Sequence, residues 1–94
     1  MANRGNIPCE VPGCGGTRAQ GYLLCSPCWR AVPRRLQSCV YSSFRAWQAV
    51  LTQKPADMPA MREASASYRA AAKAATDAAC ANRFPDLHQA MKEA

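Results

Sequence analysis

The 94-residue chain carries a formal net charge of +6 at pH 7, and 49% of its residues are hydrophobic, many of them alanine. A chain of this length forms one small domain whose core alone gives marginal stability, so a further stabilising element such as a bound ion is expected. No stretch approaches the roughly 18 consecutive apolar residues of a membrane span, which excludes an apolar transmembrane helix. We therefore expect a single domain over residues 1–94.

The positive charge is concentrated in the first part of the chain. Residues 1–54 carry seven of the 12 basic residues but only one of the six acidic residues, Glu10, whereas residues 55–94 carry five of each. Such asymmetry predicts a polyanion or an acidic protein surface as a partner. The alternative is a moderately basic protein whose charged face contacts only solvent.

Two close pairs of cysteines, separated by ten residues, form the clearest motif of the sequence. The first pair, Cys9 and Cys14, encloses a Pro-Gly turn, and the second pair, Cys25 and Cys28, has the two-residue spacing of a zinc knuckle. Four thiolates in tetrahedral arrangement are the ligands of a structural zinc site. We predict that these cysteines hold one structural Zn²⁺ in a treble-clef-like or zinc-knuckle module over residues 9–32.

Three alternatives to zinc are disulfide bonds, thiol redox chemistry and an iron ion held by the same four thiolates. Residues 1–8 lack the apolar core of a secretory signal, so we expect a reducing cytoplasm, where disulfides are rare. A thioredoxin-type redox pair needs a strand-helix-strand context that this chain lacks. Metal binding is therefore favoured, and the choice between zinc and iron stays open.

Short elements are expected within and after the cysteine motif. Residues 22–24 form an apolar run, which predicts a hairpin strand that leads into the second cysteine pair. Ser26 is expected to cap a short helix, with Pro27 at the first helical position. That helix should end at Val32, because the residue before a proline such as Pro33 is disfavoured in helical geometry.

The rest of the chain is expected to be helical, which makes the fold class mostly α. We predict a long helix over residues 33–53, a second over residues 59–83 and a short terminal helix over residues 86–94. The short connection between the long helices predicts an antiparallel hairpin, with Met61 and Tyr68 filling the wider end of an alanine-rich face. The apolar stripe of the first long helix comprises Leu36, Val40, Phe44, Trp47 and Leu51.

Two cysteines lie outside the paired motif. Cys39 falls at the edge of the apolar stripe of the first long helix, so we expect a small core residue. Cys80 falls on the polar face of the second long helix, with Lys73 two turns earlier, which suggests an exposed thiol that is reactive or forms an intermolecular bridge. An incidental half-buried cysteine is the favoured interpretation of Cys80.

No arrangement of catalytic residues is evident, and we expect that the protein is not an enzyme. The acidic residues are scattered singly, the only histidine has no acid or serine partner nearby, and no glycine-rich phosphate loop is present. A zinc ion closed by four thiolates also lacks the open coordination position that a catalytic zinc keeps.

A basic face is the best candidate for a binding site. Arginine grips phosphate bidentately and stacks on bases, and tyrosine offers a stacking surface. If five arginines neutralised five phosphates, the log-log salt slope on duplex DNA would be about −4.5. The alternative is a solvated helix face with ordinary charges. The candidate residues are Arg18, Arg30, Arg34, Arg35, Tyr41 and Arg45.

The residues around the second cysteine pair also carry a resemblance. Trp29, Val32, Pro33 and Leu36 form a Trp-x-x-Val-Pro-x-x-Leu pattern directly after a cysteine clasp. The later residues of the pattern are Val40, Phe44, Arg45, Trp47, Asp57, Met58, Pro59 and Tyr68. In this combination, over residues 9–80, the chain resembles small, mostly uncharacterised phage and prophage proteins that join a four-cysteine zinc clasp to a helical hairpin. The resemblance implies a bacterial cytoplasm and an accessory role during infection or lysogeny, but no particular activity.

Three hypotheses on function follow from these observations. The leading one is a non-enzymatic, zinc-stabilised protein that binds nucleic acid through its basic face. The second is a small inhibitor or adaptor, for example one that counters a bacterial defence, in which the same face binds an acidic host protein. The third is a self-associating structural protein, with a homodimer formed through the alanine-rich helix.

Overall fold

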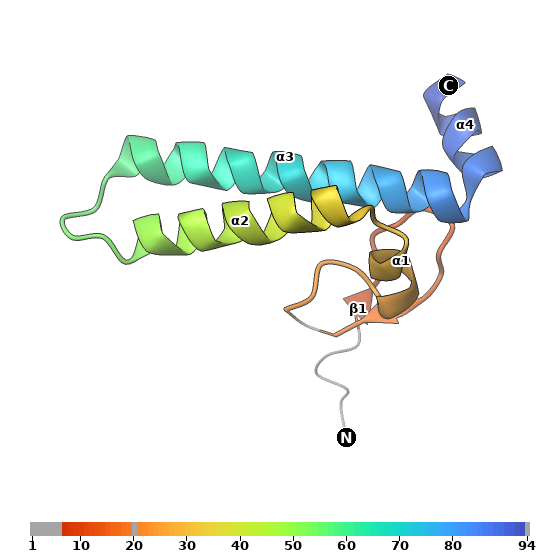
Figure 1. The fold of residues 1–94 in the computed structure, drawn as a ribbon, viewed down its shortest axis with the longest axis horizontal. Coiled ribbons are helices and arrows are strands. Elements are labelled where there is room, and N and C mark those ends of the chain that lie inside the picture. The colour runs from red at the N-terminus through yellow and green to blue at the C-terminus, as the bar shows by residue number, and fades with distance from the viewer. Residues whose placement is uncertain (1–6, 20, 94) are drawn as a thin grey trace. The chain divides into compact units, whose positions relative to one another are not determined.

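The computed structural model describes residues 7–19 and 21–93. In these residues, two short strands precede four helices along the chain (Figure 1). The strands are β1 (Ile7–Pro8) and β2 (Thr17–Arg18), and the helices are α1 (Ser26–Arg30), α2 (Arg34–Leu51), α3 (Met58–Arg83) and α4 (Pro85–Glu93). The prediction of a mostly helical fold, with a cysteine module followed by a helical hairpin and a short last helix, is confirmed.

The chain forms two compact units, and helix α3 contributes to both. The cysteine unit contains the described residues of 1–33 and 76–94, and the hairpin unit contains residues 34–75. The long helices begin and end within two residues of the expected positions. Their boundaries follow from local chemistry: at the start of α3, the amide of Ala60 donates a 3.1 Å hydrogen bond to the carboxylate of Asp57.

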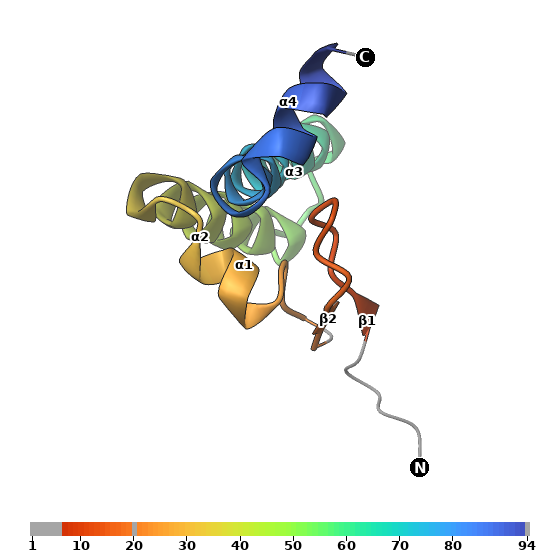
Figure 2. The same cartoon turned by 90° about the vertical axis from the view of Figure 1, so that its right-hand side faces the viewer.

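The cysteine unit begins with a small antiparallel sheet, in which Ile7 pairs with Arg18 and Pro8 pairs with Thr17 (Figure 2). The pairing continues past β1, because the amide of Cys9 donates a 2.9 Å hydrogen bond to the carbonyl of Gly16. The expected strand over residues 22–24 is wrong, since β2 lies earlier in the chain and the amide of Tyr22 closes a turn on the carbonyl of Ala19. Gly21, with φ of +96°, lies in this turn and takes a conformation that disfavours a strand.

The first residue of α1 differs from the expectation. Cys25, not Ser26, is the N-cap, because its backbone is extended and its carbonyl accepts the first hydrogen bond, from the amide of Trp29 at 2.9 Å. Ser26 therefore takes the first helical position and Pro27 the second, where the lack of an N–H group costs nothing. The short helix thus starts directly at the second cysteine pair.

The hairpin unit pairs α2 with the first part of α3, and the two helices lie side by side in both views (Figures 1 and 2). The ring of Tyr68 on α3 stacks on Trp47 of α2 with centroids 5.4 Å apart, and it lies 5.6 Å from Phe44. One partner helix covers only part of the apolar stripe on α2: Val40 is buried, whereas Phe44 and Leu51 remain 40% and 50% exposed. The predicted role of Tyr68 as a filler between the helices is confirmed by these ring contacts.

The structure corrects the expectation for Cys39 and the exposed-thiol interpretation of Cys80. Cys39 on α2 is exposed, so it is not a core residue. Cys80 on α3 is buried, and its Sγ lies 3.8 Å from the carbonyl oxygen of Pro12, so it is not an exposed thiol. The reason is that the last turns of α3 pack in the cysteine unit, where the turn between Cys9 and Cys14 covers the face that a single-helix wheel assigns to solvent.

Candidate metal centre

The four paired cysteines converge on one point. The Sγ atoms of Cys9, Cys14, Cys25 and Cys28 all lie within 4.8 Å of one another. Sγ of Cys14 lies 3.6 Å from that of Cys25 and 3.5 Å from that of Cys28, far beyond the roughly 2.0 Å of a disulfide bond. A tetrahedron with metal–sulfur bonds of about 2.3 Å has edges of about 3.8 Å. The cluster therefore fits a single ion held by four thiolates.

Local backbone geometry brings each sulfur to this point. Cys9 directly follows β1, and Cys14 follows a turn in which Gly13 has φ of +85°. Gly16 faces the cluster closely, because a Cβ atom there would lie 3.3 Å from Sγ of Cys14. Cys25 and Cys28 lie at the N-cap and in the first turn of α1. The two pairs thus approach each other through a turn and a helix start.

The surroundings of the cysteines shift the pKa values of their thiols in different directions. A hydrogen bond from the backbone of Gly16 lowers the pKa of Cys14 to about 7. Burial raises the pKa of both Cys25 and Cys28, and a hydrogen bond from Arg83 opposes that rise at Cys28. Because a metal binds thiolates, loading of this site releases protons.

The last turn of α3 supplies residues that the sequence analysis did not identify. The guanidinium of Arg83 donates from Nη1 to Sγ of Cys28 at 3.1 Å and lies 3.7 Å from Sγ of Cys14. The side-chain amide of Asn82 donates a 2.7 Å hydrogen bond to the carbonyl of Ala31, at the end of α1. These contacts join positions more than 50 residues apart, so no local spacing in the sequence indicates them.

The predicted binding residue Arg18 makes its contacts within the cysteine unit. Its guanidinium donates to the carbonyl oxygens of Tyr22 and Pro8 at 2.7 and 3.2 Å, and it forms an ion pair with Glu10 at 3.2 Å. Its side chain is only 17% exposed. Arg18 therefore holds the two halves of the clasp together, and its charge is compensated locally.

The other predicted binding residues are exposed, but they lie in both units. Arg30 belongs to the cysteine unit, whereas the remaining residues lie on α2 in the hairpin unit. We call these residues of α2 the arginine face; they are Arg34, Arg35, Tyr41 and Arg45. Helix α2 contains no Asp or Glu, and Tyr41 is 52% exposed. Within the arginine face, Arg34, Tyr41 and Arg45 share one side of the helix and Arg35 lies off to the side, and α2 offers these cations no acidic neighbour.

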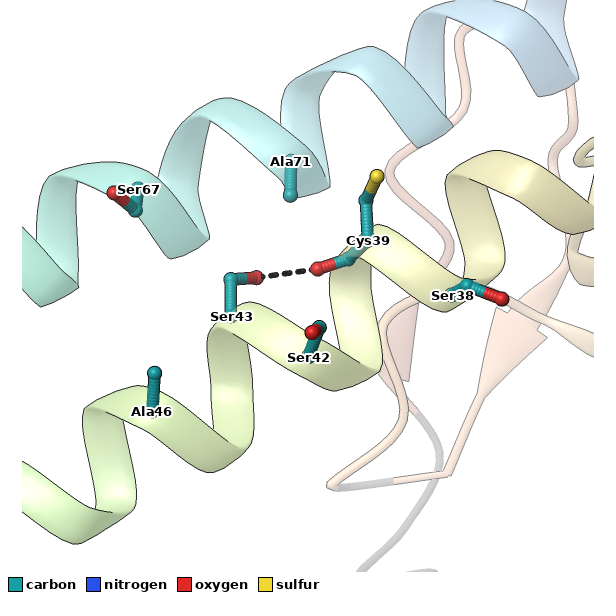
Figure 3. A pocket seen from close by; sticks show the side chains of 7 residues that line it. All are labelled: Ser38, Cys39, Ser42, Ser43, Ala46, Ser67 and Ala71. Carbon is teal, nitrogen blue, oxygen red and sulfur yellow. Dashed lines mark hydrogen bonds between the residues drawn. The ribbon is translucent and has the colours of Figure 1, made fainter.

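A shallow groove of about 550 Å³ lies between the two helices of the hairpin unit (Figure 3). Cys39, Ser43 and Ala46 extend from α2 towards α3, and Ala71 extends from α3 towards α2. The hydroxyl of Ser43 is used internally, because it donates to the carbonyl of Cys39 at 2.8 Å. The lining residues are all small: Ser38, Cys39, Ser42, Ser43, Ala46, Ser67 and Ala71. The groove is thus lined by small side chains, and most of its surface is apolar although several of these side chains are serines.

Comparison of the chain with family models, curated proteins and solved structures finds no match. The resemblance to phage and prophage proteins therefore stays a prediction. Among the described residues, no helix has both the length and the apolar character needed to cross a membrane. The four-cysteine cluster is the feature that bears most directly on function, since it is compatible with a bound metal ion.

Proposed function

We propose that this protein is a non-enzymatic, zinc-stabilised accessory protein that binds nucleic acid through the arginine face of α2. The observation that carries the proposal is the set of three exposed arginines on a helix without any acidic residue. The resemblance of the sequence to phage proteins motivates a bacterial cytoplasmic setting for this role.

The chemistry of the arginine face suits a phosphate backbone. Arg34, Tyr41 and Arg45 follow one another at spacings of seven and four residues, which places them on one side of the helix. Guanidinium groups bind phosphate oxygens bidentately, and the exposed ring of Tyr41 offers a surface for base stacking. Ser38 lies on the same side of α2 and is one of the residues that line the groove. A serine hydroxyl is a suitable hydrogen-bond donor to a phosphate oxygen.

Zinc is the ion that we propose for the cysteine cluster. Two cysteine pairs, one with a two-residue and one with a four-residue spacing, match the structural zinc sites of small domains. Such an ion closes the fold and performs no chemistry, which agrees with a binding protein of limited core size. Elemental analysis of the purified protein tests this: one zinc per chain supports the proposal, and iron or no metal contradicts it.

The test of nucleic-acid binding is a salt titration of affinity for duplex and single-stranded DNA, measured by fluorescence anisotropy. Three phosphate contacts from the arginines of α2 give a log-log slope of about −2.7 on duplex DNA. The double variant R34A/R45A should lose most of the affinity and reduce the slope by about 1.8. The matched control R62A/R69A removes two arginines from α3 and should change neither the affinity nor the salt slope strongly.

A second candidate function is favoured by exposed apolar side chains near the connection between α2 and α3. Leu51 at the end of α2 is 50% exposed, and Met58 at the start of α3 is 56% exposed. Exposed apolar side chains mark protein-binding surfaces when they form a contiguous patch, and methionine is enriched at such surfaces. If the salt titration shows no DNA binding in the zinc-loaded protein, an inhibitor or adaptor that binds an acidic host protein becomes the better hypothesis.

A further inference from the structure

The end of α3 contacts the cysteine clasp at separate points of the chain. Cys80 lies against the turn at Pro12, Asn82 binds the carbonyl of Ala31, and Arg83 reaches the sulfur cluster itself. All three residues belong to the last turn of one helix. This turn therefore closes the clasp from outside the two cysteine pairs.

The contacts of Arg83 have an electrostatic consequence for a bound ion. Four thiolates around one divalent ion carry two net negative charges, which burial makes costly. Cys28 is fully buried, and Nη1 of Arg83 lies 3.1 Å from its Sγ. The guanidinium thus brings a positive charge and an N–H donor to a sulfur that is withdrawn from water.

The position of Arg83 is set by its surroundings. Its guanidinium carbon lies 5.0 Å from the ring centroid of Phe84, at a distance typical of a cation–π contact. The hydrogen bond of the neighbouring Asn82 to Ala31 fixes the helix end relative to α1 within the cysteine unit. Arg83 itself is exposed, and its guanidinium contacts the ring of Phe84 as well as the sulfurs.

We propose that Arg83 is an outer-shell residue of the metal centre, whose N–H···S contacts with Cys28 and Cys14 compensate the charge of the thiolates and retain the ion. This inference rests on the metal site of the proposed function, but not on nucleic-acid binding. Arg83 acts through the cysteines and is not itself a ligand. Removal of outer-shell partners of metal sites lowers metal affinity by about 10- to 100-fold.

The experiment uses Co²⁺ as a spectroscopic probe in the full chain, with affinity measured by competition against a chelator. Arg83→Gln should weaken Co²⁺ binding by about 10- to 100-fold. It should also move the sulfur-to-cobalt charge-transfer absorption to lower energy, because a thiolate that loses a hydrogen bond is a better electron donor. Arg83→Lys, which keeps the charge but loses the planar donor fork, should fall between Arg83→Gln and the wild type.

The control is Arg62→Gln, which removes the same charge from the same helix about 31 Å along its axis and should leave affinity and spectrum unchanged. Wild-type affinity and spectrum in Arg83→Gln would overturn the proposal. Equal weakening in both Arg83 variants with an unshifted spectrum would also overturn it, since Arg83 would then act only by packing on Phe84. If the wild type itself binds no Co²⁺, the metal site of the proposed function fails, and this inference fails with it.

Discussion

The side chain of Asn82 donates a 2.7 Å hydrogen bond to the carbonyl of Ala31, 51 residues earlier in the chain. Ala31 is the C-cap of α1, so the bond satisfies one of the carbonyl groups that a helix end leaves without an intrahelical partner. It connects the helix that carries Cys28 to the turn of α3 that carries Arg83.

This bond predicts a stability cost for Asn82→Asp. Aspartate has nearly the same shape but offers no N–H donor, and its charge would repel the carbonyl. We expect a loss of about 1 kcal/mol in the free energy of unfolding of the metal-loaded protein, measured by urea denaturation. Asn82→Ser, which keeps a shorter donor, should lose less, and equal stability of Asn82→Asp and wild type would contradict the contact.

Metal removal should unfold the cysteine unit. Binding of a structural zinc contributes on the order of 10–16 kcal/mol to small domains, and few large side chains are buried in this unit. Addition of a chelator should therefore abolish hydrogen-exchange protection in residues 7–19, 21–33 and 76–93. Acidification should release the ion as well, because protons compete with it for the thiolates.

The matched variants for this prediction are Cys25→Ser and Cys39→Ser. The first removes a buried member of the cluster and should reproduce the effect of the chelator. The second removes an exposed thiol outside the cluster and should leave metal content at the wild-type level. Retained protection after chelation would show that the unit folds without its ion.

The two unpaired cysteines should differ sharply in reactivity. Cys39 is exposed beside the groove of the hairpin unit, whereas Cys80 is 2% exposed. In the metal-loaded protein, iodoacetamide should alkylate Cys39 within minutes and leave Cys80 unmodified until the protein is unfolded in urea. Peptide mass spectrometry after timed quenching measures both rates, and faster labelling of Cys80 would contradict the packing of α3 against Pro12.

Gly13 predicts a combined backbone and packing effect. Its φ of +85° lies in the region that side chains disfavour, and a Cβ atom there would lie 2.7 Å from Cδ2 of Leu87 on α4. Gly13→Ala should therefore destabilise the protein by more than the roughly 1–2 kcal/mol of the backbone term alone. Gly15→Ala is the control, because φ there is +67° but nothing lies within 4 Å.

A double variant separates the two parts of the effect at Gly13. Leu87→Ala removes the side chain that the new Cβ atom would meet, so G13A/L87A should be less destabilised than the sum of the single variants. Strict additivity in thermal unfolding would mean that α4 does not pack on this turn.

Local patterns predicted the parts of the fold that depend on near neighbours in the chain. The spacing of four cysteines indicated one metal cluster, and proline and alanine content placed the long helices. The cysteine pattern was readable because metal ligation requires only short turns at each pair. The burial of Cys80 was not readable, because a helical wheel assumes one packing partner, whereas α3 changes its partner along its length. Cys39 lies at the edge of the apolar stripe of α2, where a helical wheel does not show how far the partner helix reaches.

Contacts between residues far apart in the chain account for the other features that the sequence did not predict. The hydrogen bonds of Arg83 and Asn82 depend on how the end of α3 meets the clasp, and any basic residue near a helix end has the same local appearance. Arg18 illustrates the same limit. Its position in a basic part of the sequence suggested a phosphate contact, and in the structure its guanidinium donates to carbonyl groups within the cysteine unit. Charge counts alone do not distinguish these two uses of arginine.

The division of the chain at residues 34 and 75 makes the hairpin unit a continuous insertion in a discontinuous cysteine unit. The cysteine unit is therefore complete only after its second segment, residues 76–94, has been synthesised. A nascent chain that has left the ribosome only as far as the four cysteines still lacks the last turn of α3. The hairpin unit, by contrast, is one continuous segment, so it can lengthen in evolution when equal numbers of turns are added to α2 and α3.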